Sequence, residues 1–229
     1  MSDSSESARI EPGKTAERVG YFTDAVFAIA MTLLVIEIPR PQASTFDVGD
    51  GTSKTKAFTN LWHFLVAQDS AFIAYALAFF ILWIVWRGHH VLFDQVSRVS
   101  RPMIALHFPL LLLVAFLPYP TTVIGHYPDN PLAALLFTLV VGGLLLCRSL
   151  IQRRADLDDV LLPEVDRDKF RATVSLSFIV TGYWAATLAV VWWTPWVLIP
   201  WFLTSPAAHL IQRVMANRSG ADTQHDAAK

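Results

Sequence analysis

The sequence predicts an all-α integral membrane protein with six transmembrane helices. Its apolar fraction is 54% and its charged fraction is 16%, whereas soluble domains contain about 45–50% apolar and about 25% charged residues. The apolar residues are concentrated in long, nearly uncharged runs, which is typical of membrane spans. Tryptophans lie near the ends of these runs, where the bilayer interface favours aromatic rings. They are Trp62, Trp86, Trp192, Trp193 and Trp196.

The first span is expected at residues 22–38, because Pro39 and Pro41 follow it directly. A helix of this length covers about 26 Å, close to the thickness of the hydrocarbon core. A polar loop follows at residues 40–57. In the next segment, residues 58–66, apolar side chains recur at helical spacing. This segment is either a short interfacial helix or an early extension of the second span.

The other spans follow from the same pattern of long apolar runs. They are expected at residues 71–93, 103–124, 132–151, 172–192 and 196–211. The third span is predicted to end in Pro118-Tyr119-Pro120-Thr121, because prolines interrupt a helix. A charged loop at residues 152–169 precedes the fifth span. The polar residues 1–16 and 215–229 are expected to be disordered, which leaves residues 17–214 as a single six-helix domain.

Lysine and arginine are distributed unevenly about these spans. Fifteen of the 18 lie in the N-terminal arm, the second-to-third loop, the fourth-to-fifth loop and the tail, and three lie in the first-to-second loop. The positive-inside rule therefore places both termini in the cytoplasm. The net charge of −1 gives no indication of a nucleic-acid partner. The single cysteine excludes both an intramolecular disulfide and a cysteine-based zinc cluster.

Asp24 lies about one turn inside the first apolar run, where a charge is costly and indicates function. Arg18 is six residues earlier, too far for an ideal pair on one helix face. A partner on another helix is therefore expected, and the end of the second span offers Trp86-Arg87-Gly88-His89-His90. Two interpretations stay open: a polar clamp between the first and second helices, or direct handling of ions or protons.

Beyond Asp24, four residues of the first span share one helix face, namely Ile29, Thr32, Leu33 and Ile36. By periodicity alone this stripe is a packing face, and Thr32 would bond its own helix backbone. If the stripe instead faces a symmetry axis, the threonines form a ring of oxygens and the aliphatic residues form a narrow constriction. Glu37, near the outer end, would then attract cations, or it is paired or solvated.

The start of the first helix carries a recognisable motif of Arg18, Phe22, Thr23 and Asp24. Two further strings accompany it, Trp86 to His90 at the end of the second span and Phe116-Leu117-Pro118-Tyr119-Pro120-Thr121 at the end of the third. Together they resemble the transmembrane protein 175 family of potassium channels, whose signature is an arginine, three residues and Phe-Ser-Asp. Thr23 replaces the usual serine and keeps its hydroxyl. The last three spans match this family only in number and spacing.

The resemblance implies a homotetramer of six-helix subunits in the plasma membrane, surrounded by lipid, with the first helices lining a potassium pore. On this pattern Ile29 matches the hydrophobic gate, Thr32 matches a threonine layer that favours potassium, and Leu33 and Ile36 are further pore positions. The chain lacks the carbonyl filter sequence Thr-Val-Gly-Tyr-Gly. Selectivity from rings of side chains is weaker than selectivity from a cage of carbonyls, so a modest preference for potassium over sodium is expected.

The resemblance also implies a structural network that supports the pore helix. Its members on the first helix are Arg18, Phe22, Thr23 and Asp24, and its members on the second helix are His89 or His90. No cofactor, catalytic residue or resident metal is expected, since only a transient potassium ion at Thr32 is implied.

Other functions stay open on the residues alone. A secondary transporter of the same topology would use interrupted helices, and Pro109 lies inside the third span, although a lone proline commonly makes only a kink. A proton-permeable membrane protein is a further alternative. A metalloenzyme has little support, because His90 and Asp94 share a helix face but supply only two ligands.

Overall fold

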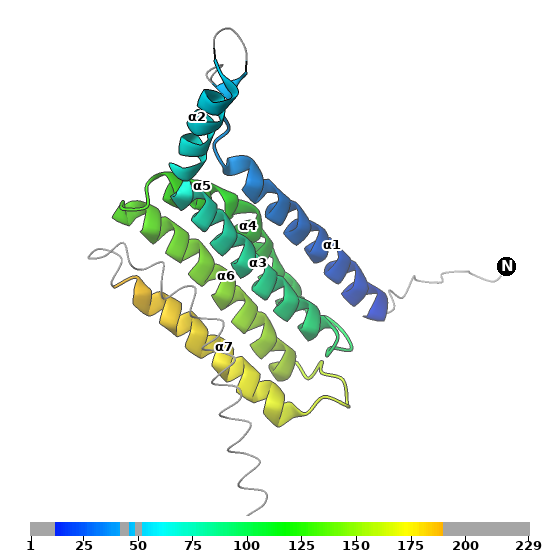
Figure 1. The fold of residues 1–229 in the computed structure, drawn as a ribbon. Helices are drawn as coiled ribbons and strands as arrows, with labels where there is room; N and C mark the ends of the chain where they lie inside the picture. Colours follow the sequence, from blue (N-terminus) through cyan, green and yellow to red (C-terminus); the bar gives the residue numbers. More distant parts are fainter. Residues whose placement is uncertain (1–11, 42–45, 49–51, 190–229) are drawn as a thin grey trace, which may run out of the picture.

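The described part of the chain is almost entirely helical. The computed structural model describes residues 12–41, 46–48 and 52–189. Its elements are α1 (Pro12–Leu33), the 3₁₀ helix η1 (Leu34–Glu37), α2 (Lys54–Val66), α3 (Asp69–Phe93), α4 (Arg101–Phe116), α5 (Pro118–His126), α6 (Pro131–Leu157) and α7 (Arg167–Thr187) (Figure 1).

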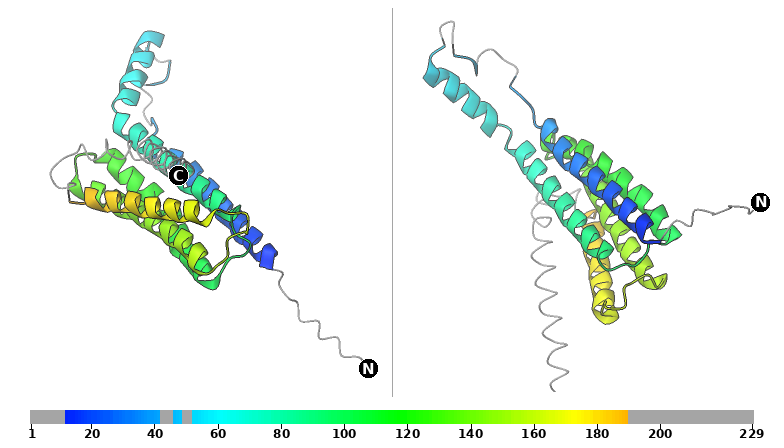
Figure 2. Two further views of the ribbon diagram at one scale, coloured as in Figure 1. Left: turned by 90° about the horizontal axis from the view of Figure 1, so that it is seen from below. Right: turned by 90° about the vertical axis from the view of Figure 1, so that its right-hand side faces the viewer.

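The long helices form a bundle in which each lies against its neighbours over most of its length (Figures 1 and 2). Helix α1 packs on α3 and α4, α6 packs on α4 and α7, and α5 lies against α3. Large apolar side chains fill the space between them and are almost completely buried. They are Phe27, Leu34, Leu77, Leu82, Met103, Leu110, Leu117, Phe137, Leu144, Ile151 and Trp184.

Four helices of the described chain are long and apolar enough to cross a membrane. They are Ala16–Glu37, Asp69–Phe93, Arg101–His126 and Pro131–Leu157, with 22, 25, 26 and 27 residues. The last three contain the second, third and fourth predicted spans, and Ala16–Glu37 covers the first predicted span except for its last residue, Ile38. Helix α7 has 21 residues and overlaps the fifth prediction, but it is not apolar enough to join the set. The sixth predicted span, 196–211, lies outside the described residues.

Two helix ends differ from the prediction because polar residues extend a helix without raising its hydropathy. Helix α1 begins at Pro12, so it includes residues 12–16 of the expected N-terminal arm. The rest of that arm lies outside the described residues, as does the expected tail at residues 215–229. Helix α6 continues to Leu157, beyond the predicted end at 151, because its last turns still bury Gln152 and Ala155. A charged helical extension beyond the bilayer has no hydropathy signal.

The string Pro118-Tyr119-Pro120-Thr121 ends helix α4 as predicted, but the prediction that it also ends the third span is wrong. Helix α4 stops at Phe116, but Leu117 keeps a helical backbone and α5 begins directly at Pro118. Proline is tolerated in the first turn of a helix, because the missing N–H has no intrahelical partner there. The prolines therefore divide one span into two helical segments, and the second segment reaches His126.

Candidate functional site

Helix α1 has one face buried in the bundle and another left open. The buried residues recur every three or four positions and face the bundle, where α1 packs on α3 and α4. They are Thr23, Phe27 and Ala30 of α1 and Leu34 at the start of η1. The opposite face carries the predicted pore positions. No described residue covers this face, so it is available to lipid or to another copy of the chain.

All four predicted pore residues lie on the open side of α1 and η1. Ile29 is 59% exposed, Leu33 is 41% exposed and Ile36 is 53% exposed, and Thr32 is exposed between them. Against the described helices of its own chain the stripe is thus not a packing face. The helix tightens to 3₁₀ geometry from Leu34, and in that geometry residues three apart eclipse one another. Leu33 and Ile36 are therefore more nearly in line than an α-helix would place them.

The Thr32 hydroxyl is oriented by its own helix. Its Oγ1 donates a hydrogen bond of 2.8 Å to the carbonyl oxygen of Ile29, as the pattern alone predicted. Because the proton is engaged with the backbone, the lone pairs of Oγ1 stay available as acceptors. An exposed threonine oxygen with this orientation is suited to contact a cation.

At the far end of the same helix, η1 is tied to α5. Glu37 is exposed, and its Oε2 accepts a hydrogen bond of 2.7 Å from Oγ1 of the partly buried Thr122. The hydroxyl of Thr122 also lies 3.0 Å from the carbonyl oxygen of Pro118. Of the alternatives for Glu37, the structure supports a paired side chain.

Asp24 is bound to the second long helix. Its Oδ1 accepts a hydrogen bond of 2.8 Å from Trp86 Nε1 on α3, so the partner comes from the expected string. The Trp86 ring in turn stacks on His90, with ring centroids 5.6 Å apart. This contact joins α1 to α3 in the manner of a clamp. Arg18 and Phe22 are both exposed, and neither is brought into this cluster within the described chain.

A second, buried contact joins α3 to α4. His89 and His107 are each 3% exposed, and their Nε2 atoms lie 2.9 Å apart. His107 Nδ1 lies 2.6 Å from the carbonyl oxygen of Met103, so Nδ1 must donate there. In the neutral ring its Nε2 is then the acceptor, and His89 Nε2 carries the proton between them.

His107 is the member of this cluster that the sequence alone does not single out. The structure shows it buried and hydrogen-bonded. Its only signal was a polar residue inside an apolar run. Thr23 is also buried, and its hydroxyl has no hydrogen-bond partner among the described residues. Thr23 lies on α1 between Phe27, whose ring faces His89, and Gly20, which lies against Phe93.

Gly88 makes room for a charged side chain from α6. A Cβ atom at Gly88 would overlap the Nη2 and Cζ atoms of Arg148. The guanidinium therefore lies directly over the backbone of α3. Arg148 Nε is buried without a hydrogen-bond partner in the described chain. This contact fixes α6 against the same end of α3 that holds Trp86 and His89.

The Gly88→Ala variant is expected to displace the Arg148 side chain and to lower the melting temperature. Overpacking costs about 1–3 kcal/mol, and the cost should lie near the lower limit because a guanidinium ends a flexible side chain. In a chain of this size, 1 kcal/mol corresponds to about 2–4 °C. The matched control is Gly142→Ala on α6, where no described atom lies within 4 Å. Equal melting temperatures for both variants in detergent would contradict the contact.

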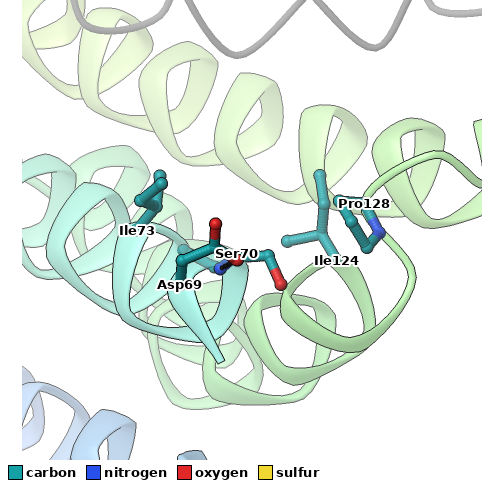
Figure 3. A pocket seen from close by; sticks show the side chains of 6 residues that line it. Asp69, Ser70, Ile73, Ile124 and Pro128 are labelled. Carbon is teal, nitrogen blue, oxygen red and sulfur yellow. Dashed lines mark hydrogen bonds between the residues drawn. The ribbon is translucent and has the colours of Figure 1, made fainter. Parts of the chain in front are cut away.

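The junction of α3 and α5 closes the other end of the bundle. Ser70 Oγ donates a 2.7 Å hydrogen bond to the carbonyl oxygen of Gly125, and a Cβ at Gly125 would lie 3.1 Å from Ala71 Cα. A shallow, largely apolar depression adjoins this contact (Figure 3), and none of the predicted pore or network residues lines it. Its lining residues are Asp69, Ser70, Ile73, Ala74, Ile124 and Pro128.

Comparison with known proteins identifies relatives along most of the chain. Residues 18–118 match the family model described as the endosomal/lysosomal potassium channel TMEM175. A potassium channel of Streptomyces collinus is 34% identical over 161 residues, which cover 68% of this chain and 72% of that protein. A potassium channel of Chamaesiphon minutus is 27% identical over 187 residues, covering 80% of this chain and 87% of that protein.

The fold is shared as well. A crystal structure of a lysosomal potassium-selective channel TMEM175 homologue from Chamaesiphon minutus matches with a TM-score of 0.68 at 23% sequence identity. The match covers 90% of this chain and 98% of that chain. The helical membrane fold and the resemblance first suggested by the Arg18–Asp24 motif are thereby confirmed. The chain belongs to the TMEM175 family.

Proposed function

We propose that the chain forms a potassium-permeable cation channel with a modest preference for potassium over sodium, and that α1 lines its pore. The observation that carries this proposal is the open stripe of α1, where the oriented hydroxyl of Thr32 lies among exposed Ile29, Leu33 and Ile36. Around a symmetry axis these residues become an oxygen layer and apolar constrictions. Membership of the TMEM175 family supports the same function.

The contacts of α1 support a rigid pore helix. Asp24 is bound to Trp86 on α3, and Glu37 is bound to Thr122 on α5. These two attachments are 13 residues apart, or about 20 Å along a helix, and they flank the proposed pore stripe on both sides. A helix held at two levels keeps the same face towards the axis, which a ring of side chains requires. In this view Asp24 acts as a structural clamp.

The assembly is a homotetramer of six-helix subunits in the plasma membrane, with both termini in the cytoplasm. The charge distribution supports this orientation, since the first-to-second loop holds only three of the 18 lysines and arginines. The Asp24–Trp86 and His89–His107 contacts then lie towards the cytoplasmic side, and Glu37 lies at the outer mouth.

The test is a recording from purified chain in a planar bilayer, with potassium on one side and sodium on the other. We expect unitary current steps. The reversal potential should differ from zero, with the sign expected for a channel that conducts potassium better than sodium. Single-channel steps separate a channel from a secondary transporter. A reversal potential of zero would refute the potassium preference, and a flux without unitary steps would refute the channel.

A further inference from the structure

Helix α2 stands apart from the rest of the bundle. Figure 1 and the right-hand view of Figure 2 show it projecting beyond the ends of α1 and α3, and its packing against the other described helices is slight. It has 13 residues, and a helix of about 12–15 residues is marginal in water without tertiary contacts. Some further surface must therefore stabilise it.

The sides of α2 differ sharply in chemistry. One side faces its own chain: Ala57 is buried, and the Phe64 ring lies 5.2 Å from the ring of Phe46. A second side is polar, with Lys56, Thr59 and His63 all exposed. The third side is apolar and open. Its residues are Phe58, Trp62, Leu65 and Val66, which are 70%, 57%, 40% and 52% exposed.

The position of this open side relative to the membrane indicates what covers it. Helix α2 ends at Val66 and the membrane-spanning α3 begins at Asp69, so only two residues separate them. The Leu65–Val66 end of the apolar side is thus held close to the point where α3 begins. Aromatic rings such as Phe58 and Trp62 are favoured at the bilayer interface. Lys54 and Lys56 at the start of the helix are exposed, and lysine side chains reach towards lipid headgroups.

We propose that α2 is a membrane-surface helix whose Phe58, Trp62, Leu65 and Val66 side chains insert into the lipid of one leaflet. The lipid completes the burial that the bundle does not provide, while Thr59 and His63 face water. The sequence had left open whether this segment extends the second span. The break between Val66 and Asp69 supports a separate helix, and the open apolar side gives it a partner. This inference depends on the membrane fold and not on the pore proposed for α1.

The test places a nitroxide label on each side of α2 in the full chain, reconstituted in liposomes of phosphatidylcholine and phosphatidylglycerol. The chain has one cysteine, Cys147, which is buried, so labelled wild type reports any background. Trp62→Cys and Leu65→Cys probe the apolar side, and Thr59→Cys and His63→Cys are the matched controls on the polar side. Collision with oxygen and with a water-soluble nickel complex is measured at each position.

We expect labels at positions 62 and 65 to collide mainly with oxygen, at a depth of about 5–10 Å in the headgroup and acyl boundary. Labels at positions 59 and 63 should collide mainly with nickel. Nickel access at all four positions would overturn the proposal. Protection from both reagents at 62 and 65, with short distances between labels on different copies, would also overturn it and assign this side to a second copy of the chain.

Discussion

The Ile29→Asn variant is expected to raise the basal potassium flux of the reconstituted channel by about tenfold or more, since each 1.36 kcal/mol removed from a barrier is a factor of about ten in rate. Ile29 is 59% exposed on the open side of α1. An apolar ring of this kind resists hydration and blocks ions by dewetting. Asparagine supplies a donor and an acceptor in every copy, so water and ions enter at a lower cost. Potassium flux from proteoliposomes, normalised to incorporated protein, measures the change.

Two control variants separate the gate from a general loss of packing. Ile29→Val keeps the position apolar and should leave the flux close to wild type. Val35→Asn introduces the same amide at a residue of similar exposure, 51%, on another side of the helix, and should not open the pore. If Val35→Asn raises the flux and Ile29→Asn does not, then a different face of α1 meets the axis.

The first four spans could be predicted because a bilayer imposes a length and an apolar composition on every helix that crosses it. The failure at Pro118 has a physical reason. Proline stops a helix that precedes it but can also begin the next one, and a single sequence does not distinguish the two cases. The extension of α6 to Leu157 was missed because charged helical turns outside the bilayer resemble a loop in hydropathy.

The candidate site was predictable within one helix and less so between helices. Helical spacing predicts that the four stripe residues share one helix face, namely Ile29, Thr32, Leu33 and Ile36. The charge on Asp24 indicated a partner on α3. Periodicity does not say which face meets which neighbour. The pairing of His89 with His107 depends on the packing of α3 against α4, and the place of Arg148 depends on the absence of a side chain at Gly88. Neither is visible in one sequence.

The Thr32→Ala variant is expected to move the potassium-sodium reversal potential to near zero while the channel still conducts. The Thr32 hydroxyl is the polar group of the open stripe, and its oxygen is oriented by the bond to the Ile29 carbonyl. A selectivity of about tenfold corresponds to only about 1.4 kcal/mol, so the loss of one oxygen from each copy removes most of a modest preference. Alanine is a strong helix former, and the helix should stay intact.

Two further substitutions decide whether chemistry or pore width carries the preference. Thr32→Ser keeps the hydroxyl and should retain the potassium preference. Thr32→Val keeps the branched shape but removes the oxygen, so it should lose the preference as alanine does. If valine retains the preference and alanine loses it, the pore radius is responsible and the oxygen is not. If all three variants reverse at the wild-type potential, the potassium ions do not pass Thr32, and α1 is not the selective part of the pore.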